Sequence, residues 1–410
     1  MKKKFLFVSL LALGLAGAPV TLTSCSDDDN NSTQTEDSDP YDYGTDDVTA
    51  DDAKAAGHAF TCVEQILDGC VDIANEVGES KIGDPISKWN NGQQTEALYA
   101  VESWYSFHSR EDYSNNILSI RNAYFGTRDG SVSTTSLSAL IAAKRPQMDV
   151  KVKEAITNAY NAILAIPNPF RNNINCQEAL VAQKKCDVLK TVIGDLKGYI
   201  EKHGSINQDE NLDPIISAYV DKVVLPTYSD LKDGNAALYD AVVTFQNTPS
   251  DANFKEVANA WLEARQPWET SEAFLFGPVD AKGLDPNMDS WPLDQSSIVN
   301  ILNNGDLDKD LNWEDGDSDD DVEAKQGVRG FHTLEFLTFR NGVARTLNDV
   351  AASDDAADLV YNSANAKRWA NYMRQVAYLL KKDAADLYNY WSVSYEGGAS
   401  YAEQFKSHEF

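Results

Sequence analysis

The chain has 410 residues, of which 35 are basic and 64 are acidic, so its formal net charge is −29 at pH 7. A surface this acidic repels the phosphates of nucleic acid and anionic lipid, and we exclude both as partners of the folded part. Roughly 355 residues remain after an N-terminal leader and an acidic segment. One hydrophobic core rarely holds so many residues, so two domains are expected.

The first 24 residues have the pattern of a lipoprotein signal peptide. Three lysines precede an apolar run that is too short to cross a membrane as a mature helix. Leu22-Thr23-Ser24-Cys25 matches a bacterial lipobox, which predicts cleavage after residue 24 and lipidation of Cys25. The alternative is an ordinary cleaved signal with an incidental cysteine. We expect contact with a membrane through this N-terminal lipid only.

Residues 25–53 are predicted to be a disordered tether. They contain eleven acidic residues and no basic one, and a hydrophilic segment of one charge sign cannot form a core. Acidic residues directly after a lipidated cysteine resemble lipoprotein surface-export tags. An outer membrane lipoprotein is therefore expected, on the cell surface or on the periplasmic face.

Helical periodicity covers nearly all of the remaining chain. Apolar residues recur at intervals of three and four in 60–77, 224–245 and 369–391, and convincing alternating strands are absent. We predict an all-α protein of two helical bundles resembling four-helix bundles, over residues 54–205 and 212–410. The polar stretch 203–214 joins them. The acidic stretch 306–321 fits no EF-hand frame and is predicted to be a mobile loop.

Four cysteines lie in the first predicted bundle, and an even number permits disulfides in an oxidising compartment. Contacting residues of two antiparallel helices have numbers with a nearly constant sum. That sum is 248 for Cys62 with Cys186 and 246 for Cys70 with Cys176, which favours this pairing between antiparallel helices at 58–77 and 177–200. The alternative is four buried free thiols.

Two groups of polar residues are candidates for a ligand site. Arg265, Glu269 and Glu272 have the spacing of one helix face, beside Trp261 and Trp268. Buried charges need partners or a ligand, although a solvated ladder of charges has the same spacing. The second group follows a helical pattern near residue 108 and includes Glu102, Ser103, Ser106 and Asp112. His108 alone is more often a structural histidine than a ligand.

The segment GFHTLEFLTF at 330–339 contains His332 and Glu335, three residues apart on a predicted helix. Their side chains face the same side, so they could share one metal ion or one buried proton. Gly330 leaves room for the close approach of another backbone or a ligand. A zinc peptidase motif H-E-x-x-H is absent from the sequence.

Several segments together resemble the imelysin family of bacterial envelope proteins, which has a GxHxxE motif and is linked mainly to iron acquisition. They are GFHTLEFLTF at 330–339, WLEARQPWETSEAFLFGPV at 261–279, MDSWPLDQSSI at 288–298, RWANYMRQVAYLLKKDAADLYNYW at 368–391 and ESWYSFHSREDYSNNILSIRNAYFG at 102–126. The last of these resembles a segment that usually closes the family's sequence, but here it comes first. We therefore expect a circularly permuted fold.

The resemblance implies a lipid-anchored protein of iron or metal uptake that binds a metal ion, or a metal-containing small ligand, at the cleft between the two bundles. It implies iron or another divalent metal on His332 and Glu335, and envelope iron-uptake proteins as partners. Peptidase activity is not expected. The expected ligand-binding residues are Glu102, Ser103, Ser106, Asp112, Arg265, Glu269, Ser271, Glu272 and Gly330. If the chain is permuted, the helix of His332 should meet the helix of Glu102 and Ser106.

Two other functions remain open at this point. One is an envelope metallopeptidase that uses His332 and Glu335 on zinc. The other is a scaffold that binds another envelope protein without a metal, in which the His–Glu pair is a structural hydrogen bond.

Overall fold

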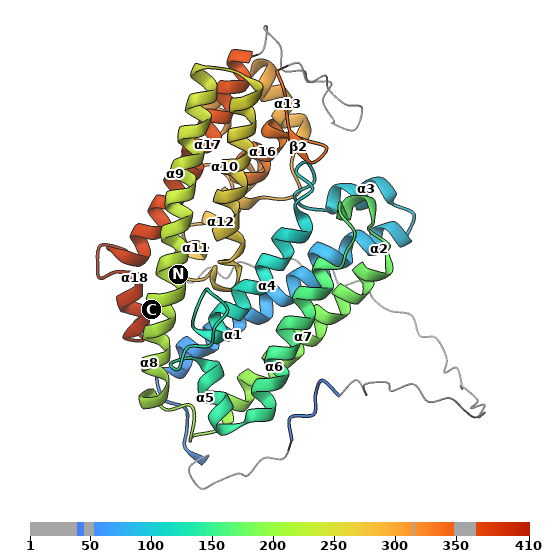
Figure 1. The fold of residues 1–410 in the computed structure, drawn as a ribbon. Coiled ribbons are helices and arrows are strands. Elements are labelled where there is room, and N and C mark those ends of the chain that lie inside the picture. Colours follow the sequence, from blue (N-terminus) through green and yellow to red (C-terminus); the bar gives the residue numbers. More distant parts are fainter. Residues whose placement is uncertain (1–38, 45–52, 315, 348–365) are drawn as a thin grey trace, which may run out of the picture. The chain divides into compact units, whose positions relative to one another are not determined.

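The computed structural model describes residues 39–44, 53–314, 316–347 and 366–410 (Figure 1). The predicted signal peptide, Cys25 and most of the predicted tether lie outside the described residues. Residues Asp39–Phe410 belong to one compact unit. None of the helices in the described part is long and apolar enough to cross a membrane.

The first half contains α1 (Phe60–Asn75), the π-helix η2 (Glu76–Gly83), α2 (Asp84–Asn90), α3 (Gln94–Ala100), α4 (Ser109–Phe125), α5 (Leu137–Lys144), α6 (Pro146–Leu164), the 3-10 turn η3 (Phe170–Asn172) and α7 (Gln177–Lys202). The second half contains α8 (Asp209–Tyr219), the π-helix η4 (Val220–Val224), α9 (Leu225–Asn247), α10 (Asp251–Glu269), the 3-10 turn η5 (Glu272–Phe274), α11 (Pro278–Ala281), α12 (Leu284–Asp289), α13 (Gln295–Asn304), α14 (Leu307–Asp310), α15 (Asp319–Gln326), α16 (Gly330–Thr338), α17 (Ala366–Ser392) and α18 (Tyr401–Lys406).

The prediction of an all-α protein is confirmed. The only strands in the described part are β1 (Phe339–Arg340) and β2 (Val343–Ala344), which pair antiparallel as a short hairpin directly after α16. The acidic stretch 306–321 was predicted to be a loop, but it includes α14 and the start of α15. Serine or aspartate side chains at the N-caps of these two helices accept backbone N–H groups, which stabilises a helical start in an acidic sequence.

Two sets of helices pack side by side. In the first set α1 packs on α4 and α7, and α6 packs on the same two helices; in the second, α9 packs on α10 and α17, and α16 on α10 and α17 (Figure 1). The long helices α1, α9 and α17 each bury one apolar stripe, as their three-and-four spacing predicts, whereas α16 is buried on every side. Helix α4 and the turn η5 connect the sets, because α4 also packs on α10 and η5 on α1. The residue boundaries of two domains and the circular permutation stay predictions.

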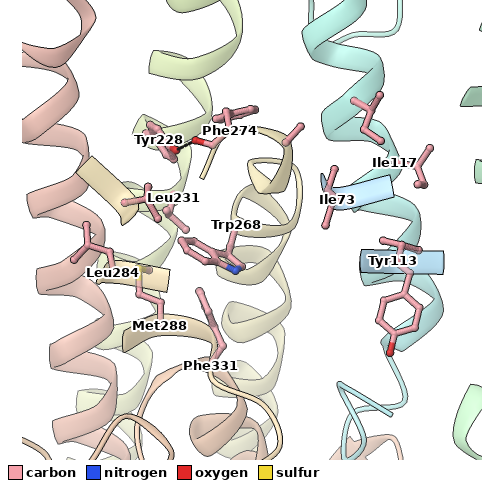
Figure 2. Packing of buried hydrophobic residues seen from close by; sticks show 14 of the residues in the cluster. Ile73, Tyr113, Ile117, Tyr228, Leu231, Trp268, Phe274, Leu284, Met288 and Phe331 are labelled. Atoms are coloured by element: carbon pink, nitrogen blue, oxygen red, sulfur yellow. Dashed lines mark hydrogen bonds between the residues drawn. The ribbon is translucent and has the colours of Figure 1, made fainter. Parts of the chain in front are cut away.

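The core of the second set surrounds a buried tryptophan near the end of α10. Figure 2 shows Trp268 packed among Leu231, Leu284, Met288 and Phe331, which come from α9, α12 and α16. The start of α10 is fixed by Ser250, whose hydroxyl accepts the N–H of Asn253 at 3.1 Å. The Ser250 cap holds the start of α10, and the packing of Trp268 holds its end. These contacts position the polar side chains of its last two turns.

The predicted disulfide pairing is wrong, and all four cysteines of this part are free. Helices α1 and α7 do run antiparallel, but in another register: the ion pair Asp68–Lys197 and the hydrogen bond Asn75–Lys190 have numbers that add up to 265 in both cases. In this register Cys186 lies opposite Gly78, 16 residues beyond Cys62. At 1.5 Å per residue that offset is about 24 Å, far beyond the roughly 7 Å that a disulfide allows.

We predict four reactive thiols per chain when the protein carrying Cys25→Ser is unfolded without reductant. The register of α1 and α7 holds the cysteines apart, and burial raises the pKa of the Cys186 thiol to about 12, which keeps it protonated and slow to oxidise. Alkylation in denaturant followed by intact mass spectrometry counts the thiols. Two or fewer alkylated thiols would contradict this register.

Candidate functional site

Helix α16 carries the His–Glu pair and is buried along its whole length. Nδ1 of His332 lies 3.0 Å from Oε2 of Glu335, one turn further along the helix. Oε1 of Glu335 accepts hydrogen bonds from the backbone N–H of Tyr105 at 3.1 Å, and from the N–H and the hydroxyl of Ser106 at 2.8 and 2.7 Å. Both carboxylate oxygens are therefore occupied, and the predicted meeting of the His332 and Ser106 segments is confirmed.

We predicted that Ser106 lies on a helix, and this prediction is wrong. Residues 101–107 form turns between α3 and α4, and Ser103 and Phe107 have φ angles of 49° and 62°. Such positive angles interrupt a right-handed helix. The turns place two consecutive N–H groups on one oxygen of Glu335. In the interior of a helix these N–H groups would instead bond to backbone carbonyls.

Arg265 of α10 lies at the centre of the site. Its guanidinium contacts Glu269 at 2.6 Å (NH2 to Oε1), Asp289 through NH1, and Asp112 at 3.5 Å (Nε to Oδ2). Arg265 is 1 % exposed, so acidic side chains rather than water surround its charge. The predicted functional face of α10 is therefore buried, and the alternative of a solvated ladder is wrong.

Glu269, Glu272 and Asp289 form a compact group of carboxylates. One oxygen of each lies within 4.8 Å of an oxygen of the others, and no other group of this kind is found among the described residues. Glu272 is not on α10 as predicted, since that helix ends at Glu269 and Glu272 begins η5. The ring of His332 adjoins the group, with Nε2 3.2 Å from Oδ1 of Asp289.

Sequence reasoning missed two members of the site. Asp289, the last residue of α12, also accepts the indole N–H of Trp268 at 2.7 Å. Lys81 of η2 lies 3.0 Å from Glu102 and 3.4 Å from Glu76 and is buried. A signal for Asp289 was present in the segment MDSWPLDQSSI, which was used only for the family resemblance. No motif or spacing in the sequence indicated Lys81, because the π-helical winding of η2 determines the direction of its side chain.

Three further predicted site residues, Ser103, Ser271 and Gly330, contact other parts of the protein. The Ser103 hydroxyl bonds to Asp112, and the Ser271 hydroxyl donates to the carbonyl of Trp268 at 2.7 Å, so Ser271 closes the end of α10. Gly330 has a φ of 85°, and a Cβ there would lie 2.5 Å from the Met288 carbonyl oxygen. The predicted close approach of a backbone to Gly330 is thus confirmed.

The sequence model of the imelysin family matches residues 44–192 and 224–409, most of the chain. The chain belongs to the imelysin family. It is similar to an imelysin peptidase from Bacteroides ovatus of known crystal structure, with 54 % identity and a TM-score of 0.69, over 70 % of this chain and 82 % of that one. It is also 34 % identical over 125 residues to iron-regulated protein A of Synechococcus elongatus, a match that covers 30 % of this chain and 31 % of the relative.

Burial and charge shift the pKa values in this imelysin site in opposite directions. Burial raises the pKa of Glu269 to about 8 and that of Asp112 to about 6, against the opposing charge of Arg265. Burial also disfavours charge on Asp289, but the charge of Arg265 and the hydrogen bond from His332 hold its pKa well below the usual range. Asp289 is therefore the carboxylate of this cluster that stays ionised at every ordinary pH.

A cavity of about 420 Å³ lies beside the buried cluster, between α4, α6 and α10. His108, Glu111, Asp112, Ser114, Asn115, Tyr160, Leu164, Leu262, Glu263 and Gln266 line it. On the other side, the indole of Trp291 packs edge-on against the His332 ring, with 4.7 Å between the ring centroids. The carboxylates are largely buried, since Glu269 and Glu272 are 0 % and 8 % exposed and Asp289 is partly buried.

We predict that Gly330→Ala lowers the free energy of unfolding by about 1–3 kcal/mol, because an added Cβ is strained at this φ and meets the Met288 carbonyl. Urea unfolding followed by circular dichroism measures the change. Gly198→Ala in α7 is the matched control, since no atom lies within 4 Å of its added Cβ, and it should be neutral or stabilising by about 0.4–1 kcal/mol. Equal effects of the two substitutions would contradict the tight contact at Gly330.

We predict that His332 is protonated in the metal-free protein at pH 7.5. Burial and the charge of Arg265 lower its pKa, but Asp289 and Glu335 more than offset them and raise it to about 9. The stability that this raised pKa contributes is fully present below pH 6.5 and is lost as pH rises through 9. NMR of ¹⁵N-labelled histidine reports the titration, and Asp289→Asn should move it toward 6.5. A wild-type ring that titrates near 6.5 would refute the prediction.

Proposed function

We propose that this protein binds a divalent metal cation, iron foremost, at the carboxylate group Glu269, Glu272 and Asp289, with Nε2 of His332 as nitrogen ligand. The observation that carries the proposal is the convergence of these three carboxylates within 4.8 Å, beside an oriented histidine. Carboxylates with one imidazole suit Fe²⁺, Mn²⁺ or Zn²⁺, whereas soft Cu⁺ prefers sulfur ligands. A group of largely buried carboxylates fits a bare cation better than a bulky metal-containing ligand.

Glu335 has a different role in this proposal from the metal ligand that the sequence suggested. Its two oxygens already accept four hydrogen bonds, including the one from His332. A carboxylate that holds the far nitrogen of a ligating histidine fixes the ring and raises its basicity. We therefore assign Glu335 the role of orienting His332 toward Asp289.

The physiological role follows from two weaker supports. A relative bears the name iron-regulated protein A, although the match covers only 31 % of that protein. The lipobox at Cys25 and the acidic residues after it favour an outer membrane lipoprotein. We propose that the protein serves iron or metal uptake at the envelope, together with uptake proteins that the chain itself does not identify.

The metallopeptidase alternative has one support, since a relative of known structure is called an imelysin peptidase. A hydrolytic zinc site needs an open coordination position and a base beside it. Here His332 is buried, Glu335 has no free oxygen, and no second histidine joins the group among the described residues. The scaffold alternative requires no metal and treats the pair as a structural hydrogen bond.

Calorimetric titration with Fe²⁺ under anaerobic conditions tests the proposal. We predict that Glu269→Gln combined with Glu272→Gln abolishes binding, because it removes two of the three carboxylates. Glu335→Gln should weaken binding by about 10–100-fold, the usual cost of losing a group that orients a metal-ligating histidine. Glu256→Gln, on the exposed face of the same helix α10, is the control and should bind as the wild type does.

Three outcomes would decide against the proposal. Absence of binding to the wild type favours the scaffold, for which His332→Ala lowers stability by about 1–3 kcal/mol without any change in a ligand. Equal binding by the Glu269 and Glu272 variant would place the metal elsewhere. Chelator-sensitive cleavage of a protein substrate that is lost in Glu335→Gln would favour the peptidase.

A further inference from the structure

The innermost side chains of the cluster are buried, with Arg265 1 % and Glu269 0 % exposed, so a cation that reaches them passes between side chains. The cavity between α4, α6 and α10 is open to solvent and ends at Asp112. The Asp112 side chain also contacts Arg265, at 3.5 Å from Oδ2 to Nε. It is thus a residue that both lines this cavity and contacts the central guanidinium of the cluster.

Asp112 carries an unsatisfied acceptor. The residue is 1 % exposed, and its Oδ2 faces Ser103 and Arg265, but its Oδ1 has no hydrogen-bond partner among the described residues. A buried carboxylate oxygen without a donor costs free energy, and a cation in the cavity would satisfy it. The unpaired Oδ1 of Asp112 therefore supports a cationic ligand in the cavity. This observation does not depend on the group Glu269, Glu272 and Asp289.

Two further side chains at the cavity have free ligand atoms. His108, at the N-cap of α4, lines the cavity, and its ring makes no hydrogen bond to another described residue, so a ring nitrogen can face a cation in the cavity. Glu111 binds Arg110 through Oε1, while its Oε2 is buried without a partner. Imidazole and carboxylate are the ligands that a borderline divalent cation accepts.

We propose that this cavity is the entry port of the buried cluster. A divalent cation is first held by His108 and Glu111, then transferred to Oδ1 of Asp112, and passes Arg265 to reach Glu269, Glu272 and Asp289. The inference rests on the proposed function and adds the route and the residues that control the rate. A negatively lined cavity raises the local concentration of cations, which increases rates of association by 10-fold or more.

The rival route runs on the Trp291 side. A second cavity of about 290 Å³ is lined there by Tyr99, Trp291, Pro292, Leu293, Asp294, Gln295 and Ser296. Its inner wall toward His332 is the indole of Trp291, which presents no ligand atom to a divalent cation. The cavity of Asp112 is lined by the imidazole of His108 and the carboxylates of Glu111 and Asp112, and Asp112 contacts Arg265 of the cluster, so it is the route that we favour.

Stopped-flow mixing with Mn²⁺ tests the port, with the change in total tryptophan fluorescence as the signal; Trp268, which donates to Asp289, is the tryptophan hydrogen-bonded to the carboxylate group. His108→Ala combined with Glu111→Gln should lower the association and dissociation rates about 10-fold and equally, because a port alters the barrier and not the bound state. Leu164→Arg, which places a cation in the cavity, should slow association in the same way. Ser296→Arg places the same charge at the second cavity and should leave both rates within about 2-fold.

The outcomes separate this inference from the proposed function. Unchanged rates in both port variants, or slowing by Ser296→Arg alone, would overturn the port while leaving the metal site intact. Weaker equilibrium binding with an unchanged association rate would make His108 and Glu111 part of the final site, which also overturns it. Failure of the wild type to bind Mn²⁺ or Fe²⁺ would instead overturn the metal site on which the port rests.

Discussion

The buried guanidinium of Arg265 is the constraint on which the rest of the site depends. It joins Asp112 of α4, Glu269 of its own helix and Asp289 of α12, segments far apart in the sequence. A single unpaired charge at this depth would be strongly destabilising, so these segments must meet for the protein to fold. The rings of Trp261 and Phe331 flank the guanidinium and exclude water. The contacts of Arg265 therefore hold together both the fold and the site.

The position of His332 follows from that arrangement. Gly330 lets the start of α16 approach the backbone at Met288, one residue before Asp289, and His332 therefore comes to lie over the Asp289 carboxylate. Glu335 then reaches the turns at Tyr105 and Ser106, which precede the helix that carries Asp112. The GxHxxE motif thus connects both sets of helices. Gly330 contacts the backbone at Met288, His332 contacts Asp289, and Glu335 contacts Ser106.

Local sequence patterns predicted the features that depend on neighbouring residues in the chain. Apolar periodicity predicted the helices, and the spacing of Arg265 and Glu269 beside two tryptophans predicted a buried charged face. The pairing of Cys62 with Cys186 failed because helix periodicity does not fix how far one helix slides along another. Lys81 was missed for a related reason: it points inward only because η2 is wound as a π-helix. The turns around Ser106 were read as helix because their polar residues happen to repeat at helical intervals.

The same contacts bear on the choice between binding and hydrolysis. Both ring nitrogens of His332 have carboxylate partners, and both oxygens of Glu335 have donors, so neither side chain is left to move a proton for a substrate. A catalytic metal needs an open coordination position for water, whereas the carboxylates here are largely buried, where a low dielectric constant strengthens their attraction for a cation. These properties support the proposed binding of a cation more than they support hydrolysis. We therefore propose acquisition and transfer of a metal rather than cleavage of a peptide.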